Sequence, residues 1–393
     1  MKFLHTSDWH LGRRFHEADL IDAQRAFLTH VHDTARDHRV DAILVAGDIY
    51  DRAIPSLDAV RLFDEALNHF ADLHLPIIMI SGNHDSAHRL GVGSRLLARA
   101  GVHLRTDPAT ACTTPVLLDD AHGTVAVYGL PYLEPALTHD ALQADKSHQG
   151  VLAAALDRVR ADLATYPDGT RSVVLAHAFV AGAQPCLSER DITVGGIDHV
   201  TTDTFRGIDY TALGHLHGAQ SPGERIHYSG SPLAYSFSET DHTKTLTVAD
   251  LAHDATLTLT RIPTPVPRPL ARLQGTLHDL LTNPAHDHLT RSWLQVTLTD
   301  PALPYEPMAQ LRRRFPHTMH LLHQRPDTPD QADRPTYTQR LQGRTDLQIA
   351  CDFVKKVRGT GPTPAEQDLL TRAVEASRIR STQEETVQCA CTS

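Results

Sequence analysis

Five short stretches of the sequence each place polar side chains directly after an apolar, strand-like run: SDWH at 7–10, GDIYD at 47–51, GNHD at 82–85, AHAF at 176–179 and GHLH at 214–217. They offer carboxylate, amide and imidazole donors from Asp8, His10, Asp48, Asn83, His177, His215 and His217. Seven donors exceed the needs of one metal ion and suit two ions roughly 3.5–4 Å apart that share a carboxylate. Because the ligands are mixed, we expect two divalent ions, Mn²⁺ first, with Mg²⁺, Fe²⁺ or Zn²⁺ as alternatives.

Each stretch taken alone has an ordinary explanation as well. GNHD is typical of a turn, GDIYD of a solvated strand end, and lone histidines of a chain that contains 27 of them. All five follow buried-type strands, with glycines where the backbone must turn, and this joint occurrence favours a metal centre. A pair of ions can clamp a phosphoryl group, lower the pKa of a bridging water and stabilise the leaving oxygen. The predicted chemistry is therefore attack on a phosphoester.

The elements that must position these donors alternate along the first hundred residues. Strands are predicted at 2–7, 41–48 and 76–85, and helices at 20–37 and 56–73, the second with Ser56 as N-cap. This alternation indicates βαβ units, whose loops at the carboxyl ends of the strands meet in one crevice. Shorter strands follow at 115–119, 124–130, 172–178 and 209–215, with a helix at 148–165. Trp9, between two donors, is expected to pack rather than to act.

The composition describes a soluble chain. Its 393 residues, 41% hydrophobic and 21% charged, indicate two or three domains. No window approaches about 18 apolar residues and no signal peptide is evident, so we expect no membrane association. Five cysteines without CxxC spacing favour a reducing cytoplasm. Residues 1–267 hold 33 acidic and 21 basic side chains, so DNA binding would need local basic loops, metal ions or a partner.

The series D-x-H, G-D-x-x-D, G-N-H-D, H and G-H-x-H, between residues 3 and about 235, resembles the calcineurin-like metallophosphoesterases. The resemblance implies an α/β fold (α+β in some schemes), a β-sandwich flanked by helices. It implies that one metal ion is held by Asp8, His10, Asp48 and His217, and the other by Asp48, Asn83, His177 and His215, with Asp48 bridging. His84 would protonate the leaving oxygen without binding metal, and Asp85 would orient His84 by a hydrogen bond.

The flanking residues narrow the resemblance. TSDWHLGRRFH, GDIYDRAIPS, SGNHDS, LAHAFVAGA, ALGHLHGAQ and YSGSPLAYSFSE are similar to the SbcD nuclease subunits of bacterial SbcCD complexes. That family implies an ATP-dependent nuclease in DNA repair, replication and recombination, with 3′→5′ exonuclease activity on duplex ends and endonuclease activity on single strands and hairpins. It also implies double-stranded and hairpin DNA as substrates, a homodimer, an SbcC-type ATPase partner with a long coiled coil in a heterotetramer, and a cytoplasmic, nucleoid-associated location.

The chain divides into four segments on this basis. They are a nuclease domain at 1–262, a small DNA-capping domain at 271–343 after a Pro-rich linker, a helical partner-binding segment at 346–380, and a disordered tail at 381–393. The helical segment has apolar faces at Ile349, Phe353, Val354, Val357, Leu369, Leu370 and Val374. Such a helix pair can pack on its own domain or bind a partner helix, and the resemblance favours the partner.

Several arginines lie near the predicted ligands or in the capping domain. Arg13, Arg14, Arg52 and Arg89 are candidate contacts to DNA phosphates, with surface charge as the other explanation. The same two explanations stand for Arg312, Arg313 and Arg314. Arg52 and Ala53 replace the small and glycine residues typical of the family at that place, and the capping domain matches only weakly.

Two alternative functions remain open. One is a stand-alone phosphodiesterase acting on cyclic nucleotides or small phosphodiesters, against which the extra region 271–393 argues. The other is a non-catalytic scaffold, against which the complete ligand set and His84 argue.

Overall fold

The structure is a computed structural model that describes residues 1–190, 192, 199–324 and 344–383. Two six-stranded sheets form its centre. The first has the order β14 (Leu257–Pro263), β13 (Thr245–Leu251), β1 (Lys2–Thr6), β4 (Ala42–Ala46), β5 (Ile77–Ile80) and β6 (Val102–Arg105). The second has the order β11 (Gln220–Gly223), β12 (Ile226–Tyr228), β10 (Tyr210–Gly214), β9 (Arg171–His177), β8 (Gly123–Gly129) and β7 (Val116–Asp120).

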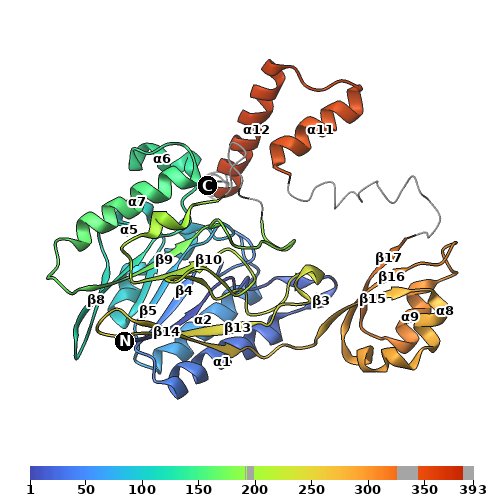
Figure 1. Cartoon of the computed structure of the whole chain (residues 1–393), viewed down its shortest axis with the longest axis horizontal. Helices are drawn as coiled ribbons and strands as arrows, with labels where there is room; N and C mark the ends of the chain where they lie inside the picture. Colours follow the sequence, from blue (N-terminus) through green and yellow to red (C-terminus); the bar gives the residue numbers. More distant parts are fainter. Residues whose placement is uncertain (191, 193–198, 325–343, 384–393) are drawn as a thin grey trace, which may run out of the picture.

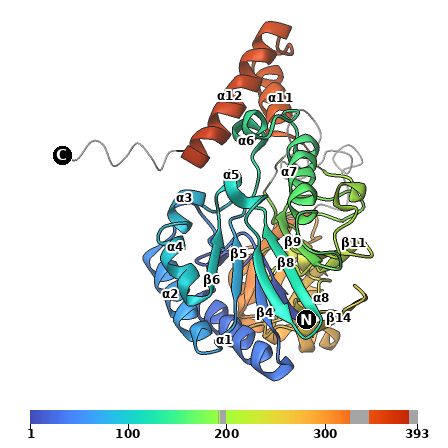
Figure 2. The same ribbon diagram turned by 90° about the vertical axis from the view of Figure 1, so that its left-hand side faces the viewer.

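The two sheets pack face to face, with helices on both outer faces (Figures 1 and 2). Their inner faces bury a shared apolar layer that includes Phe3, Leu44 and Ile78 from the first sheet and Val173 and Tyr210 from the second. Strands β4, β5 and β9 are buried at every residue, and β4 and β5 are apolar throughout because a sheet covered on both faces needs no polar side. The predicted β-sandwich flanked by helices is confirmed.

Helices α1 (Ile21–His38) and α2 (Leu57–Ala71) cover the first sheet, and α6 (Pro135–Leu142) and α7 (His148–Leu163) cover the second. Ser56 caps α2 by accepting a hydrogen bond from the backbone N–H of Ala59, as predicted. The short elements α3 (Ala87–Leu90), α4 (Ser94–Leu97), η1 (Ala98–Ala100) and α5 (Pro108–Ala111) lie between β5 and β7. Trp9 is fully buried against the rings of Phe27 and Phe70, so its predicted packing role is confirmed.

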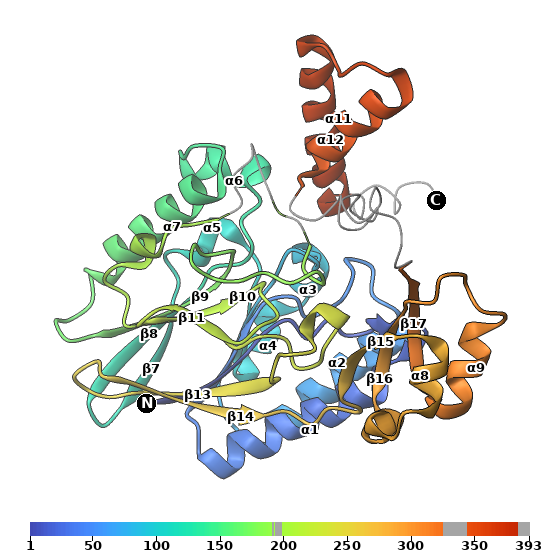
Figure 3. The same cartoon turned by 45° about the vertical axis from the view of Figure 1, so that its right-hand side comes forward.

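A smaller domain follows the linker (Figure 3). Its parallel sheet has the order β15 (Leu270–Gly275), β16 (Trp293–Leu298) and β17 (Thr318–His323), with α8 (Leu277–Thr282), η4 (Pro284–Arg291) and α9 (Pro307–Arg314). It has its own apolar core, which includes Leu280, Val296 and Phe315. The strands on either side of the linker end at Pro263 and start at Leu270, so the predicted boundaries at 262 and 271 differ from these ends by one residue each. Residues 325–343 of the predicted capping domain lie outside the described residues.

A small hairpin joins the two domains. Strands β2 (Arg14–Phe15) and β3 (Ala18–Asp19) follow the first predicted ligands. Phe15 stacks on Trp293 of the smaller domain with ring centroids 5.2 Å apart. The same apolar cluster includes Tyr235 and Phe237. The residues after His10 therefore contact both the sandwich and the smaller domain.

Two helices form the carboxyl-terminal part of the described chain. Thr345 and Gln348 make a capping box at the start of α11 (Asp346–Arg358), and α12 spans Pro364–Gln383. Residues 381–383 belong to α12, so the disordered tail predicted from 381 is wrong at its start, because the helix continues past Arg380. Residues 384–393 lie outside the described residues. Among the residues that the structure describes, no helix is long and apolar enough to span a membrane.

Candidate metal centre

The predicted ligands come together where parallel strands end. β1, β4 and β5 run parallel in the first sheet and β9 and β10 in the second, so all five ligand loops leave at the same end. Asp8, His10 and Asp48 have positive φ angles of 54°, 45° and 51°. This left-handed conformation is uncommon and is held here by backbone bonds from Asp8 N to Gly47 O and from His10 N to Asp48 O. The sharp turns direct consecutive side chains into one site.

Close approach between these loops requires glycine at two positions. A Cβ atom on Gly82 would lie 2.1 Å from Oδ1 of Asp48, and one on Gly214 would lie 1.8 Å from the carbonyl oxygen of Ala46. Neither neighbour can move, since one belongs to a predicted ligand and the other to a buried strand. Gly82 therefore allows the loops after β4 and β5 to meet, and Gly214 allows the end of β10 in the second sheet to approach β4 in the first.

One group of donor atoms surrounds His10. The Nε2 atoms of His10 and His217 are 3.1 Å apart, and Oδ2 of Asp48 lies 3.6 Å from Nε2 of His10. A carboxylate oxygen of Asp8 lies within 4.8 Å of both imidazoles. Ligand atoms that each lie about 2.0–2.2 Å from one ion are about 3 Å or slightly more apart. These four side chains are the first metal set that the family resemblance implies.

A second group surrounds Asn83. Its Oδ1 atom lies 2.9 Å from Nε2 of His177 and 3.2 Å from Nδ1 of His215. Oδ2 of Asp48 lies 3.5 Å from Nε2 of His177. One oxygen of Asp48 thus faces both groups, while its Oδ1 accepts a hydrogen bond from the backbone N–H of His84. This is the arrangement expected of a bridging carboxylate.

The outer hydrogen bonds of the imidazoles fit metal binding. Nδ1 of His177 donates to the carbonyl of Ala46 at 2.9 Å, which leaves the Nε2 lone pair free toward Asp48 and Asn83. The ligand chemistry, imidazole with carboxylate and amide oxygen, suits Mn²⁺, Fe²⁺ or Zn²⁺. The residues present therefore fit a pair of divalent ions, as the resemblance implies.

Burial controls the protonation of these groups. It lowers the pKa of His217 to about 4 despite the nearby Glu239, and lowers the pKa values of His10 and His215 well below their usual range. These three imidazoles are neutral and can act as ligands. Burial would lower the pKa of His177 as well, but the neighbouring Asp48 outweighs burial and raises that pKa to about 9, so a bound cation would have to displace the proton from His177. Burial also raises the pKa of Asp8 to about 7, so a bound cation would be needed to keep this carboxyl ionised at neutral pH.

His84 lies beside the metal groups. Its ring centroid is 4.7 Å from that of His10, in an edge-on arrangement. Nδ1 of His84 donates to the carbonyl of Asp51 at 2.8 Å. This bond fixes the ring and leaves Nε2 as the nitrogen that can carry a proton to a substrate.

The predicted hydrogen bond from Asp85 to His84 is wrong. The Asp85 carboxylate accepts the backbone N–H groups of Ile49, Tyr50 and Gly82 at 2.8–3.0 Å. Those N–H groups lie in the tight turns after β4 and β5 and have no strand partner, so a buried carboxylate satisfies them. Asp85 therefore holds two ligand loops together, and the carbonyl of Asp51 holds His84.

The four candidate DNA-binding arginines occupy different surroundings. Arg13 is mostly buried: it lies over the ring of Tyr235, donates to the carbonyl of Ser188, and has its Nε 3.6 Å from Asp51. Arg14, Arg52 and Arg89 are exposed. Arg13 thus supports the site from within, whereas the other three lie at the surface beside it.

The arginines of the smaller domain also differ among themselves. Arg314 donates to the carbonyls of Leu280 and Asn283 and pairs with Asp287. Arg312 lies 3.6 Å from Glu17 of the joining hairpin. Arg313 is exposed. Of the three, Arg314 is a structural residue.

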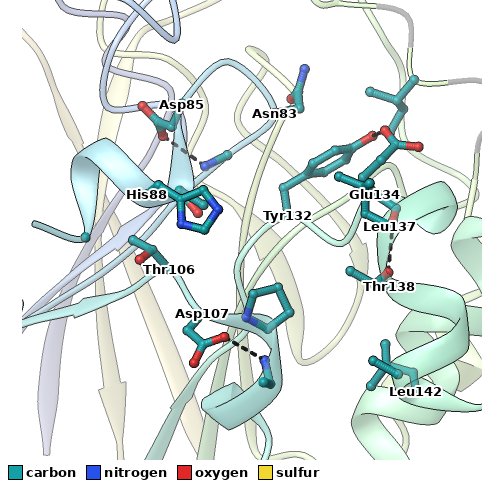
Figure 4. Close-up of a pocket in the computed structure, with 18 of the residues that line it drawn as sticks. Asn83, Asp85, His88, Thr106, Asp107, Tyr132, Glu134, Leu137, Thr138 and Leu142 are labelled. Atoms are coloured by element: carbon teal, nitrogen blue, oxygen red, sulfur yellow. Dashed lines mark hydrogen bonds between the residues drawn. The ribbon is translucent and has the colours of Figure 1, made fainter. Parts of the chain in front are cut away.

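A cavity of about 900 Å³ opens beside Asn83 (Figure 4). Tyr132 and Glu134 line one side and His88 and Asp107 another. The hydroxyl of Tyr132 donates to Glu134 at 3.2 Å, and its ring lies edge-on to His177 with centroids 6.3 Å apart. The cavity provides room for a substrate group larger than a phosphate next to the second metal set.

Sequence reasoning missed the residues that support the ligands. Tyr132 lies three residues after the end of β8, and this position near a strand end is the one feature of the sequence that could have indicated it. Ser188 forms a hydrogen bond with Nδ1 of His217, and Glu239 accepts a hydrogen bond from the hydroxyl of Ser188. Glu239 closes the stretch YSGSPLAYSFSE, but no spacing rule connects it with a histidine 22 positions earlier in the chain.

Comparison with protein families agrees with this geometry. The family described as calcineurin-like phosphoesterase matches residues 1–219, more than half of the chain. A second family, described as the type 5 capsule protein repressor C-terminal domain, matches residues 266–358. The first match defines the class of protein: a phosphoester hydrolase whose fold implies divalent metal ions.

A curated relative defines the family more closely. The SbcD nuclease of the SbcCD complex from Staphylococcus epidermidis is 30% identical over 326 residues, which is 82% of this chain and 85% of the relative. The chain belongs to the SbcD family within the calcineurin-like phosphoesterases.

Two solved structures are similar at lower identity. One, from Thermus thermophilus, is 14% identical with a TM-score of 0.39 and covers 66% of this chain and 98% of its own. The other, a dimetal phosphatase from Danio rerio, is 15% identical with a TM-score of 0.40, and the match covers 67% of this chain and 96% of the phosphatase.

Proposed function

We propose that the chain is the nuclease subunit of an SbcCD-type complex and cleaves DNA phosphodiesters with two divalent metal ions. Asp8, His10, Asp48 and His217 would hold one ion, and Asp48, Asn83, His177 and His215 the other. The observation that carries this proposal is the single Oδ2 atom of Asp48, which lies 3.6 Å from one imidazole group and 3.5 Å from the other.

The ions, when bound, would polarise the phosphoryl group of the substrate and activate the attacking water. The chain supplies the remaining steps. His84 protonates the leaving oxygen through Nε2, because its Nδ1 is committed to the carbonyl of Asp51. Tyr132, Glu134 and the cavity beside Asn83 receive a group attached to the phosphate.

We propose DNA as the substrate, cleaved from duplex ends in the 3′→5′ direction and internally in single strands and hairpins. The name of the Staphylococcus epidermidis relative supports a nuclease, and the smaller domain beside the site supports a polymeric substrate. Arg14, Arg52 and Arg89 are exposed next to ligand loops and are the proposed phosphate contacts, whereas the enclosed Arg13 is a weaker candidate.

We propose that α11 and α12 bind the ATPase partner, an SbcC-type protein with a coiled coil. Phe353, Val357 and Leu369 are large apolar side chains that remain 66%, 71% and 57% exposed. Helices of a folded domain normally bury such residues, so this face fits a partner helix. The proposed setting is the cytoplasm beside the nucleoid, where DNA and the partner are found.

A homodimer is proposed through a second apolar surface. Ile54, Leu57, Val60, Val92 and Leu96 are 42–75% exposed. They lie at the start of α2 and around α3 and α4, which follow one another along one edge of the molecule (Figure 2). We call this set the α2–α4 surface.

The test uses the full chain with Mn²⁺ and end-labelled hairpin and linear duplex DNA, with and without the ATPase partner. Cleavage that is lost in Asp48→Asn, which removes the shared charge, is the expected result. Hydrolysis of a cyclic nucleotide without DNA cleavage would instead support the stand-alone phosphodiesterase. Absence of both activities would support the scaffold.

A further inference from the structure

The segment 231–239 lies between the proposed metal centre and the smaller domain. It follows β12 and ends in η3 (Phe237–Glu239). Its side chains are buried on one side against His10 and His217, and on the other against Phe15 and Trp293. It therefore contacts a proposed metal site and the neighbouring domain at once.

A chain of hydrogen bonds runs from this segment to His217. The hydroxyl of Ser188 donates to Oε1 of Glu239 at 2.6 Å. Because that hydroxyl has one hydrogen, its oxygen must accept the N–H at Nδ1 of His217, which lies 2.7 Å away. His217 is thereby kept as the tautomer with a lone pair on Nε2, the nitrogen that faces His10 and Asp48.

Glu239 is held as a carboxylate. Its side chain is fully buried and pairs with Lys244, which is 3% exposed. Lys244 also donates to the carbonyl of His217 and to Ser231. The backbone N–H of Tyr235 donates to Oε1 of Glu239 at 3.0 Å. A buried ion pair with these extra bonds has a fixed geometry, since any displacement would leave a charge unpaired.

Tyr235 gives the segment a second contact with the same metal group. Its ring lies edge-on to both His10 and His217, with centroids 5.3 and 5.6 Å apart. Its hydroxyl donates to the carbonyl of Trp9 at 2.6 Å. No corresponding contact of this segment with Asn83 or His177 is found among the described residues.

The smaller domain contacts the side of segment 231–239 that faces away from His217. Arg272 on β15 donates to the carbonyl of Phe237. Phe237 packs edge-on against Phe15, which stacks on Trp293. The carbonyl that Arg272 holds lies two residues before Glu239, so the position of η3 depends on the smaller domain.

We propose that Ser188 and Glu239 are positioning residues for His217, and that the smaller domain, through Arg272, holds them in place. The smaller domain then stabilises one of the two metal sites, the one with His10 and His217, in addition to its proposed role toward DNA. This inference rests on the two-metal site of the proposed function.

The first test is Mn²⁺ binding to the full-length chain, measured by titration calorimetry and by the electron paramagnetic resonance signal of free Mn²⁺. Ser188→Ala removes the acceptor for Nδ1 of His217. It should weaken one of the two binding steps by roughly 10–100-fold and leave the other within about threefold, as expected for loss of an outer hydrogen bond to a ligand. Ser188→Thr keeps the hydroxyl and should restore the weakened step.

The second test addresses the smaller domain. Arg272→Met removes the guanidinium but keeps the stem, and should weaken the same binding step about threefold to tenfold. Arg268→Met is the matched control, because Arg268, just before β15, donates to the carbonyl of Arg291, and no hydrogen bond or ion pair between Arg268 and η3 is found in the described part of the chain. It should leave both steps unchanged.

The outcomes separate the inference from the proposed function. Fewer than two Mn²⁺ ions bound to the unsubstituted chain would refute the two-metal site itself. Two ions bound with no change in Ser188→Ala, or an equal loss at both steps, would overturn the positioning role, since the relay reaches His217 alone. Unchanged binding in Arg272→Met with weakened binding in Ser188→Ala would overturn the part assigned to the smaller domain.

Discussion

His84 is the proposed proton donor beside the metal groups. Its Nδ1 is committed to a backbone carbonyl 2.8 Å away, its ring is edge-on to that of His10, and a ring nitrogen lies within 4.8 Å of donor atoms of His10 and Asp48. The backbone N–H of His84, in contrast, bonds Oδ1 of Asp48. The side chain can therefore be removed without removing the backbone hydrogen bond to Asp48.

We expect His84→Ala to retain two bound Mn²⁺ ions and to lower DNA cleavage by about 10²–10⁴-fold, the usual contribution of a general acid. Calorimetric Mn²⁺ titration and a gel assay on labelled duplex measure the two effects. His122→Ala, an exposed histidine in the β7–β8 turn, serves as the control. Loss of both ions in His84→Ala would mean that His84 is a ligand.

At the scale of residues, spacing predicted the donors but not their supports. Asp8, His10 and the other predicted ligands could be picked out because each follows a buried strand, and the structure brings these strand ends together. The role of Asp85 was misjudged because a carboxylate beside a histidine satisfies equally well the backbone N–H groups of a neighbouring turn. Which of the two it binds depends on the positive φ angles of the loops, which the sequence does not reveal.

At the scale of elements, one buried cation, Arg171, links the ends of three strands, β7, β9 and β13. Arg171, 3% exposed at the start of β9, donates to Asp120 at the end of β7 and to the carbonyl of Leu251. Burial alone would raise the pKa of Asp120. The hydrogen bond from Arg171 outweighs this effect and, with the backbone N–H of His122 and the amino terminus, lowers the pKa of Asp120 to about 2.

A carboxyl group whose pKa is lowered on folding stabilises the protein above its unfolded pKa and loses that contribution as pH falls toward the folded pKa. We therefore expect Asp120→Asn to lower the free energy of unfolding by about 1–2 kcal/mol at pH 7. The difference from the unsubstituted chain should shrink between about pH 4 and pH 2. Urea unfolding at several pH values tests this, and a difference that does not change with pH would contradict it.

The α2–α4 surface is the element-scale basis of the proposed dimer. Leu96 is 68% exposed on α4, and a charge there would have to be buried without a partner in a dimer. We expect Leu96→Asp to halve the mass measured by light scattering and to leave the melting of the chain nearly unchanged. Leu117→Asp, on the exposed side of β7, is the control. A dimer that survives Leu96→Asp would place the interface elsewhere.

The sequence predicted most elements of the sandwich and few of the contacts between them. Helices α1, α2 and α7 start and end within two residues of the predicted ranges, since an apolar period of 3.6 determines them locally and a serine caps α2 and α7. The pairing of the strands into two facing sheets depends on contacts far apart in the chain, such as β1 with β13. No local pattern encodes those contacts, and the family resemblance implied the sandwich but not which strands pair.

At the scale of the whole molecule, the proposed metal ions connect the two halves of the sandwich. Asp8 and Asp48 come from the first sheet, and His177, His215 and His217 from the second. Without ions, the buried carboxylates Asp8 and Asp48 lie close together and raise the energy of the folded state. Binding that occurs only in the folded state stabilises the chain by about 2.7 kcal/mol when the free ion is at 100 times its dissociation constant.

We therefore expect EDTA to lower the melting temperature of the full chain and Mn²⁺ to restore it. The same treatment should have little effect on Asp48→Asn, which loses the carboxylate shared by both ions. Scanning calorimetry with and without EDTA measures this, and Asp41→Asn, whose carboxylate accepts from the backbone N–H of Lys2 away from the site, is the matched control. If Asp48→Asn responded to EDTA as strongly as the unsubstituted chain, the ions would have to be held by residues other than those that join the two sheets.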